Sequence, residues 1–132
     1  MTAMGRILNI LVVEDERIIG LLNESIIRSL GHKVAGNLAT GERAVEFTRS
    51  QEVDLIFMDI RLAGIMDGIE AVEHIHAQKH IPVIYISAYA DEETQARAAR
   101  TSHLAFLSKP LEPDRLKQTI DTLSGEEPSP LD

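Results

Sequence analysis

Short apolar runs alternate with longer amphipathic stretches along most of this chain. Five runs have the length of a β-strand and cover residues 7–13, 33–37, 53–58, 83–86 and 103–107. Each is followed by a stretch whose apolar positions recur at helical spacing. This alternation is typical of βαβ units, in which helices cover both faces of a parallel sheet. We therefore expect an α/β fold with a five-stranded parallel sheet.

The first helical stretch, 16–30, carries an apolar side chain at every fourth position. This stripe consists of Ile18, Leu22, Ile26 and Leu30. Such a stripe predicts the face that packs on the sheet. Gly31 is expected to end the helix, because glycine readily adopts the left-handed conformation that follows a helix.

Start signals precede the later helices. Thr40 is expected to cap the second helix, and Asp67 with Glu70 forms an acidic version of the capping box for the third. Asp91 opens the fourth, where negative charge complements the free amides of the first turn. Pro113 suits the first turn of the fifth, which needs no amide hydrogen there.

Composition narrows the class of protein. The 132 residues suit one domain, expected at 1–123, with 124–132 a flexible tail or truncated linker. A formal charge of −8 argues against binding nucleic acid. The chain has no cysteine, and the apolar segment 7–13 is too short to span a bilayer. We expect a cytoplasmic protein without a membrane partner.

Polar residues that carry chemistry stand where the predicted strands end. They are Glu14, Asp15, Asp59, Ser87 and Lys109. In a doubly wound sheet of order 2-1-3-4-5 the carboxyl ends of all strands share one edge, so these five side chains should converge. Two carboxylates about 4 Å apart repel by roughly 4 kcal/mol at an effective dielectric near 20. Three converging acids therefore indicate a bound hard cation or a raised pKa.

Four motifs at this spacing resemble those of response-regulator receiver domains of two-component signalling, the chemotaxis type included. They are Glu14-Asp15, Asp59, Ser87-Ala88 and Lys109-Pro110, and the resemblance covers residues 6 to about 123. It implies a flavodoxin-like (βα)5 three-layer sandwich and a phosphorelay protein that is not a turnover enzyme. On this resemblance Asp59 is the phosphoacceptor. Asp15 and Asp59 then bind Mg²⁺ directly, and Glu14 holds it mainly through water.

The resemblance also implies roles for the remaining residues. Lys109 pairs with a phosphoryl oxygen, Ser87 donates a hydrogen bond to another, and Arg61 offers its backbone carbonyl to the metal. Phe106 would move inward with Ser87 as a switch, although an aromatic residue in a strand is equally well explained by packing. The side chains of Arg61 and Tyr89 would shield the phosphoryl group from water.

The resemblance to receiver domains also leads us to expect two local features. The segment 61–68 is one residue longer than in chemotaxis-type receivers and lacks their proline, so Gly64 is expected to supply a backbone turn. The resemblance favours a cis peptide bond between Lys109 and Pro110.

The expected partners are a sensor histidine kinase or histidine phosphotransfer domain, and a downstream protein target bound by the fourth helix, fifth strand and fifth helix. A phosphorylation-independent receiver-like interaction module is the alternative, although such modules usually lack an acid or the lysine. A haloacid-dehalogenase-type phosphohydrolase fits poorly, because its nucleophile follows the first strand in an Asp-x-Asp pattern. Asp59-Ile60-Arg61 does not have that pattern.

Overall fold

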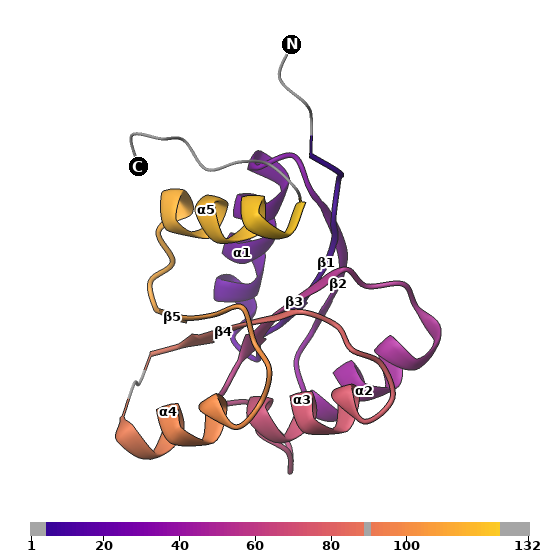
Figure 1. The fold of residues 1–132 in the computed structure, drawn as a ribbon, viewed down its shortest axis with the longest axis vertical. Coiled ribbons are helices and arrows are strands. Elements are labelled where there is room, and N and C mark those ends of the chain that lie inside the picture. The colour runs from indigo at the N-terminus through magenta and orange to yellow at the C-terminus, as the bar shows by residue number, and fades with distance from the viewer. Residues whose placement is uncertain (1–4, 89–90, 125–132) are drawn as a thin grey trace.

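A parallel sheet of five strands forms the centre of the computed structural model, which describes residues 5–88 and 91–124 (Figure 1). The strands are β1 (Asn9–Val13), β2 (Lys33–Leu38), β3 (Leu55–Asp59), β4 (Val83–Ser87) and β5 (Ala105–Ser108). Their order is β2-β1-β3-β4-β5, and every neighbouring pair is parallel. The predicted fold class and strand order are confirmed, and the strand bounds differ from the expected ones by a residue or two.

Within the described part of the chain, five helices cover the two faces of the sheet. They are α1 (Arg17–Ser29), α2 (Gly41–Ser50), α3 (Gly68–His76), α4 (Glu92–Ala99) and α5 (Pro113–Ser124). Figure 1 shows α1 and α5 on one face and α2, α3 and α4 on the other, which gives three layers. The last helix includes Ser124, and the rest of the expected tail lies outside the described residues.

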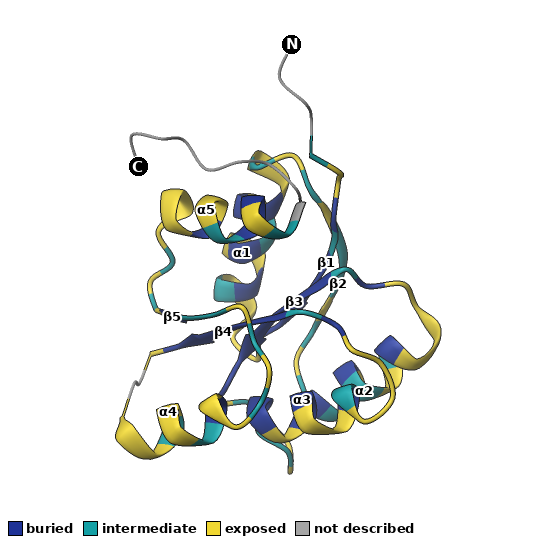
Figure 2. Ribbon diagram, viewed as in Figure 1, coloured by how far each residue is buried: buried dark blue, intermediate teal, exposed yellow. Residues whose placement is uncertain are grey.

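Alternate residues of each central strand enter two separate cores. On β3, Leu55 and Phe57 pack with residues of α1 and α5, whereas Ile56 and Met58 pack with residues of α2 and α3. Both sets are buried, so the middle of the sheet is dark blue in Figure 2. A strand buried on both faces has no polar side to alternate with its apolar one. For this reason the sequence shows continuous apolar runs.

The predicted caps are present. The hydroxyl of Thr40 accepts a hydrogen bond from the Arg43 amide (3.2 Å), and Asp91 accepts one from the Thr94 amide (2.7 Å). Asp67 and Glu70 form the reciprocal capping box of α3. These bonds satisfy amides that have no partner within their own helix. Each helix after α1 therefore begins where its sequence signal predicted.

The predicted inward face of α1 is wrong in its first half. Ile18 and Leu22 are 83% and 55% exposed, although Ile26 of the same stripe is buried. Gly20 and Asn23 are buried in their place. A Cβ on Gly20 would lie 2.9 Å from the side-chain nitrogen of Asn37, so the helix approaches β2 through its smallest residue. Packing distance, rather than the apolar stripe, sets the rotation of α1.

Candidate functional site

The polar residues at the strand ends converge on one edge of the sheet, as their positions predicted. Glu14 follows β1, Asp59 ends β3, Ser87 ends β4 and Lys109 follows β5. Parallel pairing aligns these ends, since Asp59 is opposite Ile86 and Ser87 is opposite Ser108. The Lys109 amide donates to the Ser87 carbonyl (2.9 Å), which extends the β4 to β5 pairing by one bond. The site is thus built on rigid strand ends.

Lys109 is the central cation of the site. Its ammonium nitrogen lies 2.8 Å from Glu14 Oε1 and 2.9 Å from Asp59 Oδ2. The side chains of both acids are almost completely buried, with 2% and 6% exposed. Burial lowers the pKa of Lys109, but the two carboxylates outweigh it and leave that pKa above its ordinary value. The Lys109-Pro110 bond is cis, as the resemblance indicated.

The carboxylates outnumber this cation. Glu14, Asp15 and Asp59 can each contribute an oxygen, and these three oxygens lie within 4.8 Å of one another. Burial and, next, the neighbouring Asp59 raise the pKa of Glu14, although Lys109 opposes the shift. The local charge is therefore more negative than one lysine can balance. A hard divalent cation with oxygen ligands fits this group.

A cleft of about 170 Å³ opens beside the acids and is lined by five of the expected site residues. These are Asp15, Asp59, Arg61, Ser87 and Lys109, together with Glu16 and Ala88. Of these residues Asp59 and Ser87 are buried, whereas Asp15 is exposed. Asp59 Oδ1 also accepts a hydrogen bond from the Arg61 amide (3.3 Å). Lys109 thus holds one oxygen of Asp59, and the Arg61 amide holds the other.

Of the expected site residues that the structure describes, two do not line this cleft, Glu14 and Phe106. Phe106 is half-buried and packs in the core beneath α2, α3 and α4, with its ring centroid 6.4 Å from that of Tyr85. Tyr85 itself was not singled out from the sequence, because an aromatic residue in a buried strand carries no separate signal. Tyr89, expected to shield the phosphoryl group, lies outside the described residues.

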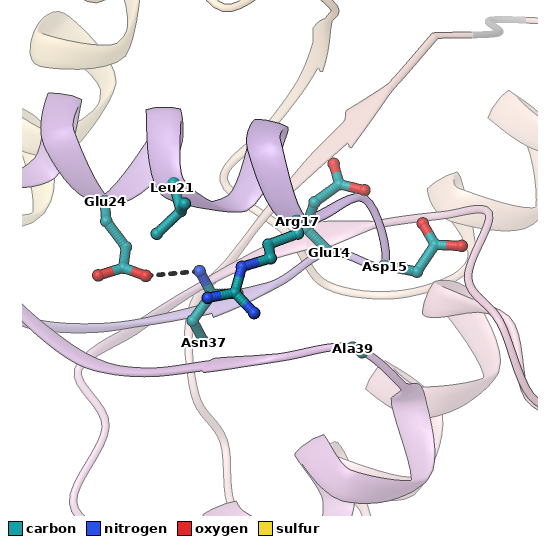
Figure 3. Close-up of a pocket in the computed structure, with 7 residues that line it drawn as sticks. All are labelled: Glu14, Asp15, Arg17, Leu21, Glu24, Asn37 and Ala39. Carbon is teal, nitrogen blue, oxygen red and sulfur yellow. Dashed lines mark hydrogen bonds between the residues drawn. The ribbon is translucent and has the colours of Figure 1, made fainter.

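A larger cavity, of about 370 Å³, is lined in part by Glu14 and Asp15 and lies between α1 and the end of β2 (Figure 3). Arg17, Leu21 and Glu24 line it from α1, and Asn37 lines it from β2. Asn37 donates a hydrogen bond to Glu24 (2.6 Å), drawn as a dashed line in Figure 3. Asp59, Ser87 and Lys109 do not line this cavity. Size alone therefore does not identify the site, and the smaller cleft has the reactive groups.

The sheet order, together with acids and a lysine at its carboxyl edge, defines a receiver-type α/β domain. The family model described as response regulator receiver domain matches residues 10–121. The chain belongs to this family. Receiver domains interact with kinases and downstream effectors in general.

Individual relatives agree with this assignment. The transcriptional regulatory protein ZraR of Escherichia coli is 38% identical over 116 residues, which are 86% of this chain but 26% of ZraR. The receiver domain of a modulated diguanylate cyclase from Desulfovibrio desulfuricans is 32% identical, with a TM-score of 0.85 over 91% of this chain and 95% of that one. This chain thus spans about a quarter of the length of ZraR.

A third relative bears on the cation. The receiver domain of the sensor histidine kinase PA1611 from Pseudomonas aeruginosa is 30% identical, with a TM-score of 0.81 over 92% of this chain and all of that chain. Its crystal structure has a magnesium ion coordinated in the active-site cleft.

Among the residues described for the present chain, no helix is long and apolar enough to cross a membrane.

Proposed function

We propose that this chain is the phosphoacceptor receiver of a two-component phosphorelay and that Asp59 takes the phosphoryl group from a phosphohistidine. The donor is a sensor histidine kinase or a histidine phosphotransfer domain. The observation that carries the proposal is the pairing of buried Asp59 and Glu14 with Lys109, which lines a cleft together with Asp59, Asp15 and Ser87. A purely structural ion pair would not need the additional exposed acid.

The transfer exchanges one bond to phosphorus for another. An oxygen of Asp59 attacks the phosphorus atom, an O–P bond forms, and the N–P bond of the donor breaks. The electron pair of that bond returns to the imidazole nitrogen. Lys109 holds the Asp59 carboxylate at 2.9 Å before transfer and can then pair with a phosphoryl oxygen. Its role is positioning and charge stabilisation.

Mg²⁺ suits the oxygen ligands of the site. Asp15 and Asp59 would bind it directly, Glu14 mainly through water, and Arg61 through its backbone carbonyl. When bound, it supplies the positive charge that lets an anionic nucleophile meet an anionic phosphoryl group. Three acidic oxygens within 4.8 Å of one another, beside the single ammonium group of Lys109, support this assignment.

Signalling would follow from the added charge on Asp59. Ser87 is buried at the end of β4 and lines the same cleft, which supports a role for its hydroxyl as a hydrogen-bond donor to a phosphoryl oxygen. Phe106 is half-buried on the neighbouring strand, so a move inward with Ser87 would bury more of its ring. The surface of α4, β5 and α5 would then bind the downstream target differently in the two states.

A single-turnover experiment separates this function from its alternatives. The protein is incubated with radiolabelled acetyl phosphate and Mg²⁺, and both bound label and released phosphate are followed. We expect one burst of labelling with slow release, abolished in Asp59→Asn and by chelation of Mg²⁺. Rapid turnover of many equivalents would indicate a phosphohydrolase. Absence of label with acetyl phosphate and with a phosphohistidine donor would indicate a phosphorylation-independent interaction module.

A further inference from the structure

The segment that joins β3 to α3, residues 60–67, is attached to the start of α2 at two points. Thr40, the cap of α2, forms an isolated parallel bridge with Ala63. Glu42, in the first turn of α2, accepts a hydrogen bond from the Met66 amide at 2.9 Å. Glu42 has no distinguishing signal in the sequence, yet it is hydrogen-bonded to the backbone of the loop that follows Asp59.

Gly64 makes room for this contact. Its φ angle is +98°, and a Cβ there would lie 2.5 Å from Glu42 Oε2. A side chain at this position would be strained by the backbone and would also collide with the carboxylate. The glycine turn therefore leaves space for the Glu42 carboxylate, and the segment packs against the start of α2.

The other end of the segment is fixed close to the acceptor. The Gly68 amide donates to the Ile60 carbonyl (2.7 Å), and a Cβ on Gly68 would collide with the Asp59 carbonyl oxygen. The Arg61 amide donates to Asp59 Oδ1. The Arg61 peptide therefore lies between an anchor at Asp59 and the bridge at Ala63, and it lines the acceptor cleft.

We propose that Glu42 is a positioning residue for the cation site. By holding the Met66 amide, it fixes the path of residues 60–67 and with it the backbone of Arg61, whose carbonyl would bind the cation. This inference rests on the proposed function, because it concerns the same site. Glu42 is not one of the three acids that come together at the site, so it acts through the loop and not as a ligand. Partners that orient ligands typically change metal affinity by about 10 to 100-fold when removed.

Four variants separate the hydrogen bond from the charge. Glu42→Ala removes both, whereas Glu42→Asp keeps the charge but withdraws the oxygens by one methylene. Glu42→Gln keeps an oxygen acceptor of the same reach. Glu46→Ala removes an exposed acid one turn further along the same helix and serves as the matched control. The Asp variant keeps an acidic residue in the first helical turn, so it tests the inference even if Glu42→Ala does not fold.

The readouts are Mg²⁺ affinity by calorimetric titration, hydrogen exchange of the Met66 amide, and the rate of Asp59 labelling at low and saturating Mg²⁺. We expect Glu42→Ala and Glu42→Asp to bind Mg²⁺ about tenfold more weakly, at the lower end of the range for such partners. Their Met66 amide should exchange faster, and their labelling should recover at saturating Mg²⁺. Glu42→Gln and Glu46→Ala should match the wild type.

Faster Met66 exchange with unchanged Mg²⁺ affinity in Glu42→Ala and Glu42→Asp would overturn the inference, because Glu42 would then support the loop alone. If the wild type binds Mg²⁺ and is labelled but these variants match it in both, only the inference fails. If the wild type neither binds Mg²⁺ nor is labelled, the proposed function fails and the inference fails with it.

Discussion

At the scale of single residues, the site depends on one lysine that pairs with two buried carboxylates. Lys109 pairs with two carboxylates that are almost inaccessible to solvent, so removing it would leave two buried negative charges without this cation. Breaking a buried ion pair from one side typically costs about 3 to 5 kcal/mol. Burying these carboxylates costs free energy, but it also brings negative charge together at the proposed cation site.

Tyr85 gives a residue-scale prediction outside the acceptor site. It is fully buried, its hydroxyl lies 2.7 Å from that of Thr101, and burial raises its pKa to about 12. The ordinary tyrosine pKa is about 10, so the folded state retains the proton more strongly than the unfolded state. Stability should be unaffected below pH 10 and should fall by roughly 2 kcal/mol as the pH rises from about 10 to about 12.

Tyr89→Phe leaves Tyr85 as the only tyrosine, because the chain has two. Its ultraviolet absorbance can then be titrated in the native state, beside urea unfolding at each pH. Native ionisation near pH 10, without loss of stability, would contradict the buried position of this side chain.

At the scale of elements, helix caps and buried strands were readable because their signals are local. The rotation of α1 was not. Gly20 and Asn23 occupy buried positions that a hydrophobic pattern assigns to the surface, and the close approach of α1 to Asn37 has no sequence signature. The bond from Met66 to Glu42 spans 24 positions and was missed for the same reason. Local patterns thus predicted the elements but not all of their contacts.

Two truncations test which face of α1 is buried. Ile27 is fully buried, so Ile27→Ala should destabilise the fold by about 2 to 5 kcal/mol. Leu22 is about half exposed, so Leu22→Ala should cost less than about 1 kcal/mol. Urea unfolding of both variants measures the difference. A larger loss for Leu22→Ala than for Ile27→Ala would mean that the predicted stripe, and not the observed face, packs on the sheet.

The start of α3 gives a second prediction at this scale. Asp67 caps the helix and also forms an ion pair with Arg97 of α4, with 2.8 Å between Oδ2 and the guanidinium nitrogen. Asp67→Ala loses both and should destabilise the fold by about 1 to 2 kcal/mol. Arg97→Ala loses only the partly exposed pair and should cost less than about 1 kcal/mol.

Arg100→Ala is the control, because Arg100 is an exposed cation at the end of the same helix. All three variants can be compared by urea unfolding at one salt concentration. A loss for Arg97→Ala as large as that for Asp67→Ala would show that the link between α3 and α4 outweighs the cap.

At the scale of the whole molecule, the four motifs identified the family because they are distant in sequence yet meet at one edge of the sheet. Sheet topology makes this convergence predictable once the strand order is known. The roles of Asp59, Asp15, Glu14, Ser87, Lys109 and Arg61 in phosphoryl transfer stay predictions. The geometry brings these residues together, and solution chemistry must test what they do.

Cation binding should be visible in global stability. At Mg²⁺ ten times above its dissociation constant, binding to the folded state adds about 1.4 kcal/mol, or about 3 to 5 °C in Tm. Asp15→Asn removes one expected ligand from the exposed side of the site and should lose most of this shift. Thermal unfolding in Mg²⁺ and in KCl of equal ionic strength measures it. An equal shift in the wild type and the variant would contradict a site at these acids.

The most direct test of the account identifies the residue that carries the phosphoryl group. Protein treated with acetyl phosphate and Mg²⁺ is reduced with borohydride, which converts an aspartyl phosphate to homoserine, and its peptides are sequenced by mass spectrometry. We predict homoserine at position 59 alone, and none when Mg²⁺ is left out. Homoserine at another acid, or unmodified Asp59 in protein that carries the label, would contradict it.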